Sequence, residues 1–361
     1  MALIFDYLDW RGDVPFSVSP FNEIDNYIIS KIGTPDYTGL LPRSMTEIPI
    51  RDLCDRYFGV YGEEGRYLGL LASPRINPMI KRLPDTVRFG ELKLSGFVSK
   101  IIPSETEQFS ALTVTLPDGT RYVSFRGTDD NLIAWKENLL IAVRETVAAQ
   151  ADALDYLIRA ASELDGPIIV GGHSKGGNLA VYAAANAPKE IQDRIICVYN
   201  NDGPGFRQEF LATEGYRAIR SRVQTLLPQH SIVGTLLTQD EGFIIVRSTK
   251  SGIGAHDGFN WETTPKGFVR CPKLSRGSRA FEESMTTVLE KMDDEERLDF
   301  IEELFEVLGA TGAVTLTDLT DHKLSSAITI VNSLRKGSKT KKFIVEIIEK
   351  TLKEFSQIRN N

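Results

Sequence analysis

Residues 167–187 read PIIVGGHSKGGNLAVYAAANA and contain the pattern from which the fold can be predicted. A short apolar run, typical of a buried strand, leads into the pentapeptide GHSKG at 172–176, and a run of small residues, typical of a helix, leads out of it. GHSKG matches G-x-S-x-G, the strand-to-helix turn that lifts a serine above a sheet. Such a turn crowds the positions two before and two after the serine, and Gly172 and Gly176 keep both clear. The pattern therefore predicts that Ser174 is a nucleophile.

Strands and helices alternate after this turn, and a hairpin precedes it. Pro117-Asp118-Gly119 separates two segments rich in strand-forming residues, and Gly119 can take the positive φ that a hairpin turn needs. Downstream, apolar runs typical of buried strands recur with helical segments between them, at 194–201, 221–227 and 242–248. Strands that alternate with helices form a mainly parallel sheet with helices on both faces. Together with the turn, this order predicts an α/β-hydrolase fold.

Three regions are expected along the 361 residues. Residues 1–85 indicate a mixed, partly helical segment that packs on the core, residues 86–277 the α/β-hydrolase core, and residues 278–361 a helical C-terminal appendage of amphipathic segments. The role of the appendage stays open between a lid, a dimer contact and a packing module. Its short basic run KGSKTKK at 336–342 is typical of a solvated loop.

Four histidines are available as the base that activates Ser174. In an α/β-hydrolase the histidine follows the last strand of the sheet, and His256 follows the run FIIVRS on a loop with several glycines. His230 follows an earlier strand and is the alternative. His173 lies inside the turn, where a packing or hydrogen-bonding role is expected, and His322 lies in a polar stretch of the appendage. We predict that His256 is the base.

The base needs a buried carboxylate to orient it. The usual place is directly after the strand-like run SRVQTLL, where PQHS follows and no carboxylate occurs before Asp240. One strand earlier, the run RIICVYNN leads directly into Asp202, which a parallel sheet places at its carboxyl edge. We predict Asp202 as the acid, with Asp240 and Asp257 as the alternatives.

Acyl transfer also needs two N–H donors that face the oxygen of the tetrahedral intermediate. The backbone N–H of Lys175, directly after the nucleophile, is one. The second is expected after the strand-like run YVSF, where Arg126-Gly127-Thr128 follows and Thr128 can donate through its N–H and its hydroxyl. Arg126 is expected to anchor this loop, and Thr128 or Asp129 could instead cap a helix. We therefore predict an oxyanion hole at Thr128 and Lys175.

These motifs carry two family resemblances. FRGT followed by Trp135, and then GHSKGGNLA, resemble the class 3 lipases over about residues 110–260. That resemblance implies that Thr128 belongs to the oxyanion hole. It also implies an acid after SRVQTLL, where Ser231 stands instead, and this departure favours Asp202. Over nearly the whole chain, the segments FDYLDWRGD, PFNEIDNYI, VSFRGTDD, GGHSKGGNLA, YNNDGPGF, LLPQHSIVG and AHDGFNW resemble the bacterial, lipase-like family called Mbeg1-like, which implies a hydrolase triad.

The expected activity is hydrolysis of a carboxylic ester through an acyl-enzyme on Ser174. Lipid acyl esters are the substrate class that the resemblance to lipases implies. A thioesterase, an amidase or an acyltransferase would use the same triad, and a catalytically weak scaffold that acts as a binding protein is the remaining alternative. The expected reaction calls for neither a metal nor an organic cofactor.

Composition limits the partners and the location of the protein. A formal net charge of −7, without a dense basic stripe, argues against nucleic acid as a partner. The cysteines, Cys54, Cys197 and Cys271, form no CxxC pair, and the first residues lack the basic region of a signal peptide. No uninterrupted apolar stretch is long enough to span a membrane. A cytoplasmic protein is therefore expected.

Overall fold

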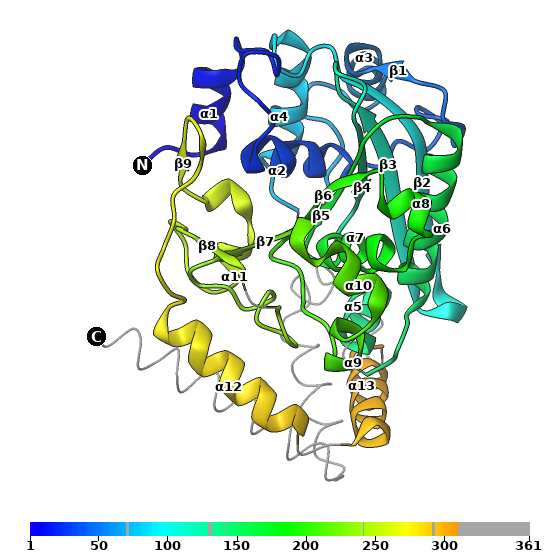
Figure 1. The fold of residues 1–361 in the computed structure, drawn as a ribbon, viewed down its shortest axis with the longest axis vertical. Coiled ribbons are helices and arrows are strands. Elements are labelled where there is room, and N and C mark those ends of the chain that lie inside the picture. The colour runs from blue at the N-terminus through cyan, green and yellow to red at the C-terminus, as the bar shows by residue number, and fades with distance from the viewer. Residues whose placement is uncertain (70–71, 129–131, 142, 241, 291–292, 310–361) are drawn as a thin grey trace.

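The computed structural model describes residues 1–69, 72–128, 132–141, 143–240, 242–290 and 293–309, and within them an eight-stranded sheet is surrounded by helices (Figure 1). The strands of this sheet are β1 (Ile48–Pro49), β2 (Lys93–Ile102), β3 (Glu107–Thr115), β4 (Arg121–Phe125), β5 (Ile168–His173), β6 (Ile195–Asn201), β7 (Val223–Pro228) and β8 (Ile244–Val246). A separate pair is formed by β9 (Thr263–Thr264) and β10 (Gly267–Phe268). The helices are α1 (Ile4–Arg11), α2 (Glu23–Ile32), α3 (Ile50–Tyr61), α4 (Ile76–Arg82), α5 (Leu132–Leu140), α6 (Ala148–Glu163), α7 (Lys175–Asn186), α8 (Lys189–Gln192), α9 (Gln208–Leu211), α10 (Glu214–Ile219), α11 (Ile253–His256), α12 (Arg276–Glu290) and α13 (Asp294–Gly309).

The strands of the main sheet lie side by side in the order in which they occur along the chain. β1 to β4 pair antiparallel, and Gly119, with a φ of 87°, lies in the turn between β3 and β4 as the hairpin signal predicts. β4 to β8 pair parallel, with Phe125 opposite Gly172 and His173 opposite Asn201. The carboxyl ends of β4, β5, β6 and β7 therefore meet at one edge of the sheet, where ligands and catalytic groups gather in open α/β sheets.

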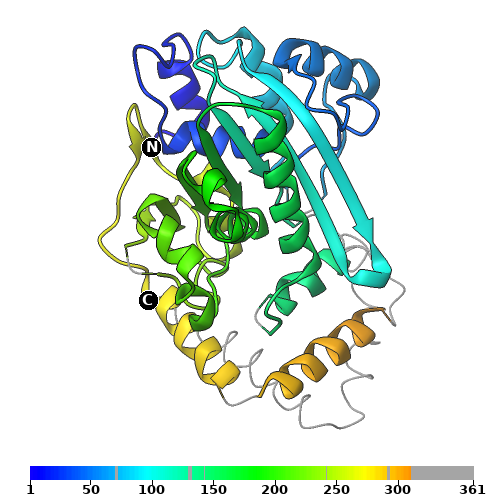
Figure 2. The ribbon, with the colours of Figure 1, turned by 45° about the vertical axis from the view of Figure 1, so that its right-hand side comes forward.

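Helices cover both faces of this sheet (Figure 2). Along β5, Ile169 joins the core shared with the N-terminal helices, whereas Val170 joins the core shared with α6 and α7. Tyr199 and Val198 divide between the two cores in the same way along β6, because successive side chains of a strand point to opposite faces. A mainly parallel sheet, covered on both faces and with a strand-turn-helix unit at β5 and α7, confirms the predicted α/β-hydrolase fold.

The N-terminal helices pack on the sheet and on the segment that follows β8. The ring of Tyr27, in α2, lies 5.3 Å from that of Trp261 and 6.0 Å from that of Phe259, measured between centroids. All three side chains are almost completely buried. Helix α2 therefore supports the segment that carries His256, while the predicted division of the chain into three regions stays a prediction.

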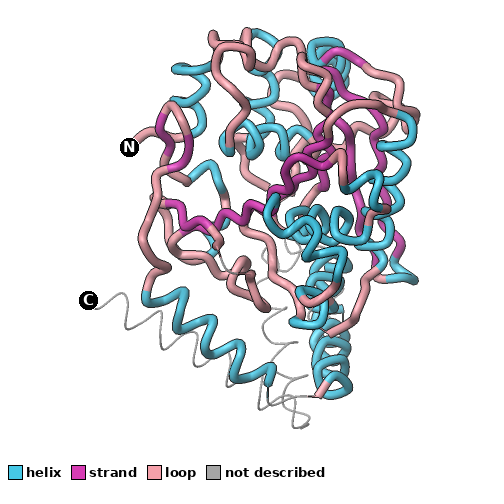
Figure 3. Tube along the Cα trace, in the orientation of Figure 1, coloured by secondary structure: helices cyan, strands magenta, loops and turns pink. Residues whose placement is uncertain are grey.

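Two helices of the predicted appendage, α12 and α13, lie at the same end of the molecule (Figure 3). Ser278 of α12 donates from Oγ to the carbonyl oxygen of Ser231 over 2.6 Å, and Ile301 of α13 is buried in one cluster with Leu140 of α5. Across the described ranges, no helix combines the length and the apolar character needed to cross a membrane. The basic run at 336–342 and His322 lie outside the described residues.

Candidate active site

Ser174 occupies the turn between β5 and α7 in a strained backbone conformation. Its φ is 58° and its ψ is −133°, a region that residues with a Cβ rarely adopt. The glycines around it are required by space. A Cβ on Gly172 would lie 2.3 Å from the carbonyl carbon of Gly176, and a Cβ on Gly176 would lie 2.1 Å from the carbonyl oxygen of Phe125. The turn therefore leaves no space for a side chain at either position, which explains the two glycines of the G-x-S-x-G pattern.

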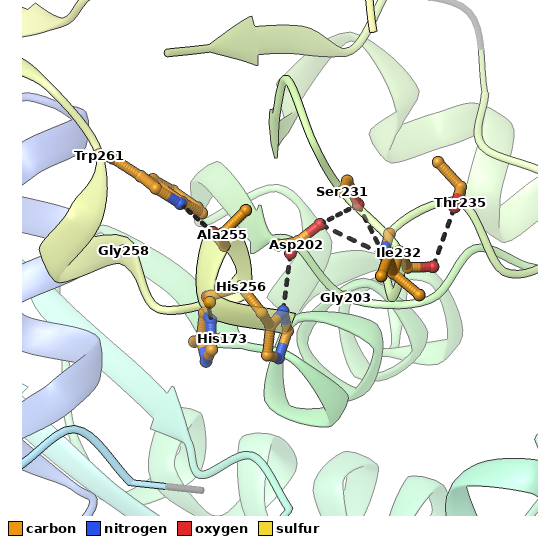
Figure 4. A network of polar contacts seen from close by, with 12 residues as sticks. His173, Asp202, Gly203, Ser231, Ile232, Thr235, Ala255, His256, Gly258 and Trp261 are labelled. Atoms are coloured by element: carbon orange, nitrogen blue, oxygen red, sulfur yellow. Dashed lines mark hydrogen bonds and ion pairs between the residues drawn. The ribbon is translucent and has the colours of Figure 1, made fainter. Parts of the chain in front are cut away.

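Asp202 and His256 are joined by a hydrogen bond at the carboxyl edge of the sheet (Figure 4). His256 Nδ1, at the end of α11, lies 2.6 Å from Oδ2 of Asp202, which directly follows β6. Burial raises the pKa of Asp202, whereas the hydrogen bonds from His256, Ser231 and Gly234 act in the opposite direction and favour the carboxylate. Because a carboxylate only accepts, Nδ1 carries the proton of this bond. Nε2 of a neutral His256 is then free to take a proton from another group.

The ring of His256 lies beside the nucleophile turn. It packs on the ring of His173, the residue before Ser174, with 4.3 Å between the ring centroids (Figure 4). Within the described residues the Ser174 hydroxyl forms no hydrogen bond, so the bond between Asp202 and His256 is formed here and one between Ser174 and His256 is not. Such a bond often tightens only in the complex with substrate.

The alternative acids and the alternative base have other partners. Asp240 is paired with Arg220, with 2.5 Å between Oδ2 and Nε. Asp257, although next to His256 in sequence, is paired with Arg75 over 2.7 Å. The ring of His230 lies 2.9 Å from the side-chain amide of the preceding residue. The two aspartates are thus paired with arginines and His230 with an amide, whereas Asp202 and His256 are paired with each other.

The loop after β4 lies against the nucleophile. A Cβ on Gly127 would lie 2.6 Å from the carbonyl oxygen of His173 and 3.2 Å from Cβ of Ser174, so a glycine is what lets the loop come this close. Asn138 of α5 donates its side-chain amide to Oγ1 of Thr128. A hydroxyl that accepts from an amide keeps its own proton for another acceptor. Thr128 therefore has a donor to offer beside Ser174.

Arg126 directly follows β4, at the start of the same loop. Arg126 donates to the carbonyl oxygen of Thr34 over 3.4 Å, which agrees with an anchoring role. Asp129 and the side chain of Trp135 lie outside what the structure describes. In the described part of the chain, no group of three or more His, Cys, Asp or Glu side chains could hold a metal ion.

Lys175 opens α7 directly after Ser174, so its backbone N–H belongs to the N-terminal end of that helix. Its side chain turns inward instead: Nζ lies 2.9 Å from Oε2 of Glu137, and both side chains are almost completely buried. Glu137 belongs to α5, the helix that also carries Asn138, so this ion pair ties the nucleophile turn to the helix behind the Thr128 loop. This ion pair was not predicted, because a single glutamate beside the largely apolar stretch NLLIAV does not show whether it will be buried.

His173 makes the hydrogen bonds that its place in the turn suggests. Its Nε2 lies 2.7 Å from the carbonyl oxygen of His256, and its Nδ1 lies 2.8 Å from Nζ of Lys31. Lys31 belongs to α2, in the region where the sequence revealed no chemistry. A lysine within a helix gives no signal of such a contact, because most lysines are exposed.

Comparison with known proteins gives a family match and likenesses to solved structures, two of which are lipases. A family model described as Mbeg1-like matches residues 83–306, which is more than half of the chain. The crystal structure of M37 lipase is similar with a TM-score of 0.34 and 16% identity, over 51% of this chain and 67% of that chain. The Rhizomucor miehei lipase propeptide complex is similar with a TM-score of 0.32 and 14% identity, over 69% and 82%. No curated protein matches the sequence.

Proposed function

The chain belongs to the Mbeg1-like family, as its motifs predict, and on this premise we propose that it is a serine hydrolase that cleaves carboxylic esters. The observation that carries the proposal is the Asp202–His256 hydrogen bond of 2.6 Å, beside a serine held at a φ of 58°. Both features are unfavourable for stability, because the first buries a carboxylate and the second strains the backbone. Together they support Asp202, His256 and Ser174 as the acid, the base and the nucleophile of a triad.

In the proposed acylation step, Nε2 of His256 takes the hydroxyl proton as Oγ of Ser174 attacks the ester carbonyl carbon. Asp202 stabilises the imidazolium that results and holds its Nδ1–H. Substrate binding brings Oγ of Ser174 to Nε2, and the imidazolium then passes its proton to the alcohol that leaves. The product of this step is an acyl-enzyme on Ser174.

The backbone N–H of Lys175 and the N–H and hydroxyl of Thr128 stabilise the negative oxygen of the tetrahedral intermediate. Their positions at the start of α7 and on the loop packed against Ser174 support this role. A water molecule, deprotonated by Nε2 of His256, then attacks the acyl-enzyme and releases the acid. Each proton taken by His256 is returned within the same half-reaction, so the enzyme is regenerated without a cofactor.

We propose that the substrates are carboxylic esters, with lipid acyl esters among them. Because the same triad would also cleave thioesters or transfer acyl groups, the leaving group and the acceptor decide between these reactions. The protein is proposed to act in the cytoplasm, since Cys54, Cys197 and Cys271 are all free thiols. Fractionation of the source cells, followed by detection of the protein in the soluble and membrane fractions, tests that location.

The test of the triad is covalent labelling of the purified protein with a fluorophosphonate, which reacts with an activated serine. The variants are Ser174→Ala, His256→Ala and Asp202→Asn, with His230→Ala as the matched control. We expect wild type and His230→Ala to be labelled, Ser174→Ala not to be labelled, and the other two to be labelled about a hundredfold or more slowly.

A panel of nitrophenyl esters of increasing acyl length, with matched acyl thioesters, then defines the substrate class. Hydrolysis that increases with acyl length supports lipid esters, whereas preference for thioesters would replace the ester assignment. A folded wild-type protein that is never labelled would overturn the enzyme proposal and leave a binding protein built on the hydrolase fold.

A further inference from the structure

A buried lysine contacts His173, the residue whose ring packs on the candidate base His256. Lys31 is only 9% exposed, and its ammonium group is 2.8 Å from Nδ1 of His173 and 5.1 Å from the centre of the Tyr27 ring. None of these contacts is an ion pair, and burial lowers the pKa of Lys31 to about 8, with the nearby Asp257 acting in the opposite direction. A charged side chain in such a place is unfavourable for stability, so a role beyond packing is worth testing.

The contact with Lys31 fixes the protonation of the His173 ring. An ammonium group only donates hydrogen bonds, so Nδ1 of His173 must accept and the proton of the neutral ring must sit on Nε2. Burial, together with the charge of Lys31, lowers the pKa of His173 well below its ordinary value, which keeps the ring neutral. The Nε2–H then donates to the carbonyl oxygen of His256 over 2.7 Å. In the other tautomer, Nε2 would turn a lone pair toward that carbonyl.

His256 is therefore held from two sides. Asp202 binds the ring through Nδ1, and His173 binds the backbone through the carbonyl oxygen while its ring lies 4.3 Å from the His256 ring. Helix α11, which ends at His256, is only four residues long and gives the backbone little support of its own. Helix α2 adds a further hold one turn before Lys31, where Tyr27 accepts a hydrogen bond of 2.9 Å from the N–H of Gly258.

We propose that Lys31 and His173 act as a positioning pair for the catalytic base: Lys31 selects the tautomer of His173, and His173 holds the His256 backbone so that Nε2 faces Ser174. The proposal rests on the proposed function, since it assigns a task to the base of that reaction. Neither residue is proposed to touch the substrate.

The variants that test the pair differ in one donor each. His173→Gln keeps an N–H close to the position of Nε2, whereas His173→Leu has a similar bulk and no donor. Lys31→Met keeps the length of the side chain and removes its hydrogen bond to Nδ1. Lys189→Met, at an exposed lysine paired with Asp193, is the control for loss of a charge.

Two measurements are made on each variant. The first is the rate of fluorophosphonate labelling at saturating probe, which separates chemistry from binding. The second is the low-field proton signal of the hydrogen-bonded Nδ1–H of His256, together with the ¹⁵N spectrum of the four histidines. We expect His173→Leu and Lys31→Met to slow labelling by about tenfold or more and to broaden the low-field signal, because a small displacement of a catalytic group is enough. His173→Gln should recover most of the rate, and Lys189→Met should match wild type.

Three results would overturn the proposal that Lys31 and His173 position His256. The first is wild-type labelling and an unchanged His256 signal in His173→Leu. The second is an equal loss in His173→Gln and His173→Leu, which would mean that the ring only fills space. The third is an unchanged tautomer of His173 in Lys31→Met. If wild type itself is not labelled, the proposed function fails, and the effect of Lys31→Met on the His256 signal still decides whether the pair positions this residue.

Discussion

Oγ of Ser231 donates a hydrogen bond of 2.5 Å to Oδ1 of Asp202, the carboxylate oxygen that His256 does not use. Ser231 stands after β7, the place from which the resemblance to class 3 lipases would draw the acid. Here a residue at that place donates to Asp202, the proposed acid, which follows the neighbouring strand β6. The two positions are close enough to share one hydrogen bond, so we expect a carboxylate at either of them to reach the proposed base.

Removing the carboxylate at position 202 should slow the reaction, and placing one at position 231 should restore part of the rate. Asp202→Asn should slow labelling of Ser174 by about a hundredfold or more, because the amide no longer stabilises the imidazolium. Asparagine tolerates the positive φ of 50° at this position, so the backbone should be kept. The double variant Asp202→Asn, Ser231→Asp should recover part of that loss, as measured by the labelling rate.

Ser231→Ala is the control, since it removes the supporting donor and leaves the acid. We expect a smaller loss than in Asp202→Asn. If the double variant is as slow as the single one although it is folded, the position after β7 cannot supply an acid to His256.

The strained backbone conformation of Ser174 should affect the free energy of unfolding. Because its φ of 58° and ψ of −133° favour glycine, the free energy of unfolding should be about 1 kcal/mol higher for Ser174→Gly than for Ser174→Ala. Both variants remove the hydroxyl, so the comparison isolates the backbone. Urea unfolding of the two proteins measures the difference.

Ser162, an exposed residue near the end of α6, provides the reference for an ordinary helical conformation. There the order should be reversed, with the glycine variant less stable than the alanine variant by about 0.5–1 kcal/mol. The same order at both serines would contradict the assignment of strain to Ser174.

Replacing one member of the buried ion pair of Lys175 and Glu137 should lower the free energy of unfolding. Lys175→Met leaves the Glu137 carboxylate buried without its cation, so we expect a loss of about 3–5 kcal/mol in the free energy of unfolding. Adding Glu137→Gln removes the charge that was left behind, and the double variant should be more stable than Lys175→Met. Urea unfolding of wild type, both single variants and the double variant completes the cycle. A purely additive result would mean that the two side chains do not stabilise each other.

The stability contribution of Lys31 should depend on pH. Its pKa is about 8 in the folded protein and near 10.5 when the chain is unfolded, so between these values the unfolded chain holds more protons. Wild type should therefore gain stability relative to Lys31→Met as the pH rises from 8 to 10, by roughly 2 kcal/mol, and the difference should be constant below pH 7. Unfolding free energies measured across this range test the sign. A slope of opposite sign for Lys31→Met would exclude a lowered pKa.

The parts of the fold and site that the sequence predicted are those with short-range signals. The turn at Ser174 is marked by glycines two residues away on each side, and Asp202 and His256 each follow a recognisable apolar strand. Parallel pairing then brings the ends of these strands together, which places the predicted acid beside the predicted base.

The supporting contacts could not be predicted because their partners are far apart in sequence. Lys31 and His173 are separated by 142 residues, and Lys175 and Glu137 by 38. Nothing in a lone lysine or glutamate tells whether it will be buried, since that depends on which helix covers which face of the sheet. Ser231 is the intermediate case: its place after β7 was recognised, but its hydrogen bond to Asp202 was not.

The order of the main sheet has a consequence for how the chain can be made. Because each strand pairs with the one before it, no strand has to enter a gap between two strands that are already paired. A chain that leaves the ribosome from its N-terminus can therefore extend the sheet at a single growing edge, from β1 to β8. The nucleophile turn would be enclosed by β6 and α7 before the segment that carries His256 is synthesised. Of the three residues of the proposed triad, His256 is then synthesised last, and its segment packs onto α2, which precedes the first strand of the sheet.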